Sequence, residues 1–182
     1  MRPLSLLAVG LLIALLDISF EGVDVVADWI GWLVVLLACA GLPPQLAPAR
    51  LAVAGAAALL VSVAIWIPGA LVDVEALPLP LAWAISLPEV GFGLLLALSM
   101  ARAAGGAGDE SARGWWRLVL AGNIVVLLLP PVVYGAGVVA VLLVGVLIGL
   151  VTAITEIVLC FRHGDRPWAQ PTPEHAAGPP LP

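Results

Sequence analysis

The 182-residue sequence has few charged residues and no lysine. Charged residues make up 10% and hydrophobic residues 63% of the chain, with a mean hydropathy of +1.16. Soluble globular domains carry about 25% charged residues, so this composition excludes a soluble domain of ordinary kind. The basic residues are all arginines, and none forms a basic stretch with interleaved aromatic residues. We therefore do not expect nucleic acid as a partner.

Histidine and cysteine are equally scarce. His163 and His175 both lie near the C-terminus, so the sequence has no HExxH motif, no Ser–His pair and no histidine-based metal site. We expect neither an enzyme nor a cofactor. Cys39 and Cys160 each fall near the cytoplasmic end of a predicted membrane span, where thiols stay reduced. Both are expected to be small buried fillers.

Long apolar runs dominate the sequence. Six of them approach the roughly 17–25 residues that a transmembrane helix needs, and glycines, prolines or acids separate them. The sequence predicts an all-α integral membrane bundle of three helical hairpins within residues 1–162. A Pro-rich tail over residues 163–182 is expected to be disordered. The predicted spans cover residues 3–20, 25–42, 51–67, 81–101, 115–134 and 138–161.

The arginines predict the orientation. With the N-terminus inside, six spans place every arginine on the cytoplasmic side, and the outer loops then carry only acids. A single span over 115–161 would put Arg162 and Arg166 outside, which favours six. We predict a plasma (inner) membrane protein with both termini cytoplasmic. Aromatic residues near the span ends fit an interfacial belt; these are Trp29, Trp32, Trp66, Trp83, Trp115, Trp116 and Tyr134.

Four acids gather at the tip of the first predicted hairpin: Asp17, Glu21, Asp24 and Asp28. The spacing places Asp17 and Glu21 on one face of the first helix. It places Asp24 and Asp28 on one face of the second. Clustered carboxylates are what hard cations prefer, so one interpretation is a cation or proton site open to the outside. Helix capping and a solvated acidic loop are the alternative.

Glu89 is an acid within a predicted span. It follows Pro88 and lies about 12 Å into the membrane from the outer side. Ser86, Glu89, Gly93 and Ala97 share one helical face. Because small-residue faces pack against other helices, Glu89 is expected to point into the bundle.

The last predicted span repeats this arrangement. Gly145, Gly149, Thr152 and Glu156 share one face, and the two glycines form a GxxxG packing pair. Glu156 and Asn123 both lie about 9 Å from the inner edge of the membrane. If the fifth and sixth helices are neighbours, the two side chains can form a hydrogen bond. Ionisable residues within a membrane mark functional sites by default.

The first hairpin follows the pattern Asp17-x4-Gly22-x-Asp24-x3-Asp28-x2-Gly31-Trp32, and a later helix carries Pro88-Glu89 and runs into Arg102. These features resemble a loose group of small multi-pass bacterial membrane proteins to which no function is assigned. The resemblance implies the fold type and a bacterial plasma membrane. It implies no activity.

Two functional hypotheses follow. The first is a non-enzymatic subunit or regulator in the lipid bilayer. It would form homo- or hetero-oligomers along the Gly145–Gly149 face or act through its cytoplasmic loop. The alternative is a small proton- or cation-coupled permease. Its candidate site comprises Asp17, Glu21, Asp24, Asp28, Glu89, Asn123 and Glu156.

Overall fold

A computed structural model of the chain describes residues 2–16, 19–20, 23–24, 28–66, 77–136 and 140–170. Six α-helices dominate this part, which confirms the predicted all-helical fold. They are α1 (Pro3–Leu15), α2 (Asp28–Cys39), α3 (Pro48–Trp66), α4 (Leu79–Gly106), α5 (Glu110–Ala136) and α6 (Ala140–His163). A short 3-10 turn, η1 (Pro44–Leu46), precedes α3, and another, η3 (Pro167–Ala169), follows α6. Strands β1 (Ser19–Phe20) and β2 (Val23–Asp24) pair antiparallel between α1 and α2.

Four helices, α3 to α6, are long and apolar enough to cross a membrane. Each of them extends past its predicted span at the end that carries arginine, because charged residues continue a helix readily in water. Helix α5 also passes through Pro130 and Pro131 without ending there.

Helices α1 and α2 are shorter than predicted, with 13 and 12 residues. At 1.5 Å per residue they measure roughly 20 Å, against a hydrocarbon core of about 30 Å. The predicted helical spans over 3–20 and 25–42 are therefore too long. The backbone at Ser19–Phe20 and Val23–Asp24 forms an extended ladder instead of continuing either helix.

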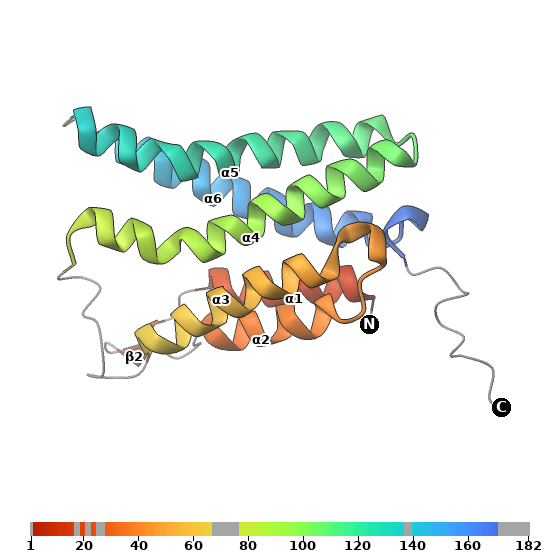
Figure 1. Cartoon of the computed structure of the whole chain (residues 1–182), viewed down its shortest axis with the longest axis horizontal. Helices are drawn as coiled ribbons and strands as arrows, with labels where there is room; N and C mark the ends of the chain where they lie inside the picture. The colour runs from red at the N-terminus through yellow and green to blue at the C-terminus, as the bar shows by residue number, and fades with distance from the viewer. Residues whose placement is uncertain are drawn as a thin grey trace.

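The helices run side by side along the long axis of the molecule (Figure 1). Each helix packs against the next one in the chain, and α6 packs back against α1. This order closes the six helices into a ring. The N-terminus and η3 lie at the same end of the ring, as Figure 1 shows.

All the arginines lie at this end, which we term the arginine end. They occupy the outermost turns of the helices or the segments beside them: Arg2, Arg50, Arg102, Arg113, Arg117, Arg162 and Arg166. The β1–β2 ladder and Asp28, the first residue of α2, lie at the opposite end, termed the hairpin end. The two ends of the ring therefore differ in charge.

The hydrophobic core is concentrated toward the arginine end. The largest fully buried side chains fall in that half of helices α1 to α5, in or beside η1, or at mid-height: Leu4, Leu7, Val35, Cys39, Pro43, Leu46, Leu51, Phe92, Leu96, Met100, Trp116 and Val119. Toward the hairpin end most residues of α3 to α6 are exposed or half-buried, and α3 and α5 diverge in Figure 1. The ring is densely packed at one end and looser at the other.

Two tryptophans predicted for the interfacial belt belong to the core instead. Trp32 is 2% exposed and packs edge-on against Phe92, and Trp116 is fully buried. The prediction relied on their nearness to the span ends. It was wrong for these two residues because both lie on the inner face of their helices. Trp66 and Trp115 are 44% and 47% exposed, as a belt would require.

The predicted packing face of α6 contacts α5 within the same chain. A side-chain carbon added at Gly145 would overlap Leu129, and one at Gly149 would touch Val126. Thr152 fills the space left by the missing side chain of Gly122 in the same way. The small residues thus let two helices of one chain approach closely.

The predicted disordered tail begins too early at residue 163. His163 is the buried last residue of α6, and the chain continues through η3 to Gln170. Trp168 anchors this segment, because its indole N–H donates to Asp109 at 3.3 Å. Its carbonyl accepts a hydrogen bond from Gln45 at 3.2 Å. Residues 171–182 lie outside the described part of the chain.

Both cysteines are buried and free, as expected.

Candidate functional site

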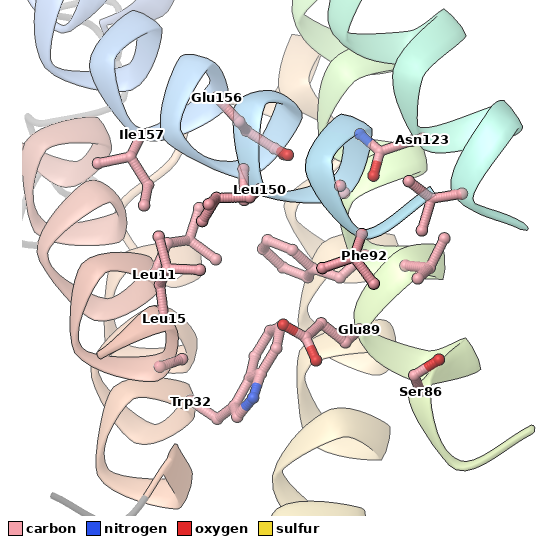
Figure 2. Close-up of a pocket in the computed structure, with 17 residues that line it drawn as sticks. Leu11, Leu15, Trp32, Ser86, Glu89, Phe92, Asn123, Leu150, Glu156 and Ile157 are labelled. Carbon is pink, nitrogen blue, oxygen red and sulfur yellow. The ribbon is translucent and has the colours of Figure 1, made fainter. Parts of the chain in front are cut away.

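Two adjoining cavities occupy the looser half of the ring. The first measures about 370 Å³ and is lined by α1, α2, α4, α5 and α6 (Figure 2). The second measures about 250 Å³ and lies among α2, α3 and α4. Trp32, Ser86 and Glu89 line both, so these side chains form the wall between them.

Glu89 occupies the central position in this arrangement. Its side chain is exposed although it lies on the inner side of α4, because it faces both cavities. Its carboxylate lies beside the indole ring of Trp32 in Figure 2. Asp28 lines the second cavity, and its charge acts on Glu89. The second cavity thus connects the acid at the hairpin end with the acid at mid-height.

Glu156 is the deepest acid of the site. It is 6% exposed and lines the first cavity, and its Oε1 atom has no hydrogen-bond partner among the described residues. The Asn123 side chain forms a hydrogen bond with the Glu156 carboxylate, and its amide also donates to the Val119 carbonyl at 3.2 Å. The bond to the backbone holds the Asn123 amide in place. One oxygen of the Glu156 carboxylate is therefore hydrogen-bonded, whereas Oε1 is buried without a partner among the described residues.

Gly93 makes room for this pair. A side-chain carbon at Gly93 would lie 2.9 Å from Asn123 Oδ1 and 3.2 Å from Glu156 Oε2, both closer than ordinary contact. The glycine lets α4 approach α5 and α6 at the level where the two polar side chains meet.

Carboxyl groups line the first cavity without a basic side chain beside them in the described part of the chain. Glu89 and Glu156 line it, and no arginine or histidine does so among those residues. The charge of Glu89 also acts on Glu156. A buried carboxylate without a cationic partner is strongly unfavourable, so this arrangement favours a proton or a bound cation.

The other acids of the first hairpin are placed differently. Asp17 and Glu21 lie outside the described residues. Asp24 pairs through its backbone with Ser19 in the β-ladder, so it does not share a helical face with Asp28, contrary to the prediction. The ladder requires an extended backbone where the prediction assumed helix.

Sequence reasoning overlooked the aromatic wall of the first cavity. The rings of Trp32 and Phe92 meet edge-to-face, with centroids 5.3 Å apart. Trp32 follows Asp28 by four residues and Phe92 follows Glu89 by three, so each shares a helical face with an acid. That spacing was readable in the sequence and could have identified both residues.

No group of three or more histidine, cysteine or acidic side chains among the described residues could hold a metal ion. Comparison with protein-family models, curated proteins and solved structures finds no match for this chain.

Proposed function

We propose that this protein is a small membrane permease that carries a proton or another cation, in a conformation whose binding site faces the hairpin end. The proposal is carried by the carboxylate of Glu156. This carboxylate is buried, and its Oε1 has no hydrogen-bond partner among the described residues. Glu156 lines the first cavity, which adjoins the cavity of Asp28 at Glu89. A helix-packing acid would be expected to have both oxygens satisfied.

The depths of the acids fit a path. Asp28 lies at the hairpin end, and Glu89 is ten residues into α4, about 15 Å from that end. Glu156 precedes Arg162 by six residues and lies about 9 Å from the arginine end of the apolar segment. Beyond it the core is packed. Transport would therefore require the arginine half to loosen while the hairpin half closes.

The permease is proposed to cross the plasma membrane six times, with both termini cytoplasmic. Support comes from the arginines, which all lie at one end of the ring, as the positive-inside rule requires of the cytoplasmic face. In this arrangement the short helices α1 and α2 complete their crossings together with the hairpin that joins them. The group of small multi-pass bacterial proteins that the sequence resembles would share this topology.

Topology can be tested with Gly106→Cys. Gly106 is exposed at the end of α4, and an added side chain meets nothing within 4 Å. A membrane-impermeant maleimide should label it only after the cytoplasmic face is opened. Labelling of intact cells from outside would contradict the proposed orientation.

Transport can be tested in reconstituted vesicles under an imposed pH gradient or cation gradient. Glu89→Gln and Glu156→Gln should each abolish the flux, since a neutral amide can neither release a proton nor pair with a cation. Glu110→Gln is the matched control, because Glu110 is exposed and forms its ion pair among the described residues with Arg113. Flux from the unmutated protein no greater than that of empty vesicles would refute the permease.

The other predicted role, a non-enzymatic subunit or regulator, has less support. The Gly145–Gly149 face along which we expected partner contacts is covered by α5. Purification in mild detergent tests this role. A second protein recovered at fixed stoichiometry would favour it, and a lone chain with active transport would count against it.

A further inference from the structure

The first cavity is too large for a proton or a bare metal ion. Its volume of about 370 Å³ falls within the range of sites for small organic ligands, roughly 300–1,000 Å³. Its walls are mainly hydrocarbon: Leu11, Leu15, Val90, Val126, Leu150 and Ile157 are among the lining residues. A ligand that fills this space must itself be largely apolar.

The polar groups of the same cavity indicate the charge of the ligand. Apart from backbone, the described lining offers the side-chain oxygens of Glu89, Glu156, Asn123 and Ser86. A hard divalent cation takes about six to eight oxygen ligands, which the apolar walls do not supply. An organic cation needs only one or two carboxylates, because its hydrocarbon part is solvated by the walls.

Aromatic rings complete this environment. The faces of tryptophan and phenylalanine attract cations, and tryptophan does so most strongly. Trp32 and Phe92 line the cavity, and Figure 2 shows Trp32 beside the carboxylate of Glu89. The two rings are 2% and 1% exposed, so a cationic group near Glu89 would meet the carboxylate with the aromatic pair packed directly behind it.

We propose that the cavity binds a monovalent organic cation with apolar substituents, such as a hydrophobic amine or a quaternary ammonium compound. The inference rests on the proposed permease function and names its substrate class. Glu89 and Glu156 supply the negative charge, and Glu156 is the deepest acid that lines the cavity. Because a carboxylate binds a cation only when ionised, protons compete with the substrate for the same two groups.

The cavity also has a mouth suited to such a substrate. Val146 and Leu150 of α6 line the cavity and are 67% and 46% exposed. The opening therefore lies among apolar side chains along the hairpin half of α6. An amphiphilic cation that partitions into lipid would meet this opening directly.

The test uses two probes of equal size and opposite charge, tetraphenylphosphonium and tetraphenylborate, in equilibrium dialysis against the purified full-length protein. The phosphonium should bind saturably, and Glu156→Gln should weaken binding by about tenfold or more. Glu110→Gln should leave binding unchanged. The borate should show no saturable binding. Equal binding of both probes, or phosphonium binding that Glu156→Gln does not alter, would overturn the inference.

A second pair of variants guards against misfolding of Glu156→Gln. Val146→Trp would narrow the mouth, whereas Leu143→Trp alters a 72% exposed residue of the same helix that does not line the cavity. In a time course of phosphonium binding, the rate should fall in Val146→Trp and stay unchanged in Leu143→Trp. Equal rates in both variants would contradict the proposed mouth.

The vesicle assay distinguishes a failure of the proposed substrate class from a failure of the proposed permease function. Glu89-dependent proton or inorganic cation flux without phosphonium binding would refute the substrate class and keep the permease. Saturable phosphonium binding without flux of any probe would keep the site and refute transport.

Discussion

Replacing Gly31 with alanine tests a close backbone contact between α1 and α2. A side-chain carbon at this position of α2 would lie 2.6 Å from the Gly10 carbonyl oxygen and 2.6 Å from the Ala14 nitrogen. Both atoms belong to the backbone of α1, so neither can move aside as a side chain would. The two helices would have to separate or shift along each other.

The cost follows from these distances. Favourable contact between heavy atoms begins near 3.5 Å, so the helices must part by about 1 Å at this point. A gap of that size forfeits a quarter to a half of each displaced dispersion contact, and overpacking of this kind destabilises by about 1–3 kcal/mol. The intrinsic preference of a helix for alanine over glycine offsets up to about 1 kcal/mol of this loss.

The assay is reversible unfolding in mixed detergent micelles, followed by circular dichroism, with Gly91→Ala as the matched control. Gly91 lies within α4, where an added carbon meets nothing within 4 Å, so this variant should be unchanged or slightly more stable. Gly31→Ala should fall below it by about 1–3 kcal/mol. If the two variants unfold at the same denaturant concentration, α1 and α2 are not in backbone contact at Gly31.

Further predictions concern α5 and the arginine end. Gly122→Ala should destabilise the protein because the added carbon would overlap Thr152 Oγ1, and Thr152→Ala in the same chain should restore much of the loss in a double-mutant cycle. Asp109 accepts the backbone N–H of Ala112 and the indole N–H of Trp168, and these hydrogen bonds lower the pKa of Asp109 below its ordinary value. A lowered pKa in the folded chain means that the carboxylate stabilises the docked segment above its ordinary pKa and loses this effect as the pH falls through the lowered value. Protease cleavage near Trp168 should therefore increase only in acid, and Asp109→Ala should show the increase already at neutral pH.

Hydropathy and the positions of the arginines predicted much of the fold. Runs of apolar residues located α3 to α6, because a buried or lipid-facing helix must be apolar over its length. Hydropathy did not locate the ends of α1 and α2. An apolar residue has the same hydropathy in a helix and in an extended ladder, so hydropathy did not reveal strand β1 at Ser19–Phe20.

The residues of the candidate site could be predicted from the sequence, but the helix contacts that bring them together could not. Helical spacing placed Glu89 and Gly93 on one face and Glu156 on another, and matched depth suggested that Asn123 meets Glu156. Which helices touch depends on the closure of the ring by α6 against α1, which no single-helix pattern encodes. The same limitation left the contact between Trp32 and Phe92 unpredicted, although the spacing of each residue from an acid was readable in the sequence.

The tail shows a different limit. Its proline content and low hydropathy suggested disorder from residue 163 onward. Composition is an average over many residues, so it does not register the contacts of a single side chain. Trp168 anchors η3 through hydrogen bonds with Asp109 and Gln45, which come from distant parts of the chain. Ala169 is buried in the core, and Arg166 pairs with Asp109 at 3.8 Å. A few specific contacts of this kind can order a short segment whose average composition is typical of disorder.

The distribution of packing and charge in the ring has a common physical cause. A carboxylate in a dense apolar core pays the full desolvation penalty, so acids and tight packing exclude each other unless a partner is supplied. The arginine half is tightly packed, whereas Asp28 and Glu89 lie where the helices separate and leave cavities. Glu156 lies at the boundary, with one oxygen bound by Asn123 and the other buried without a partner among the described residues. Under the proposed permease, the packing around this second oxygen must open before a cation or a proton from the cavity can reach it.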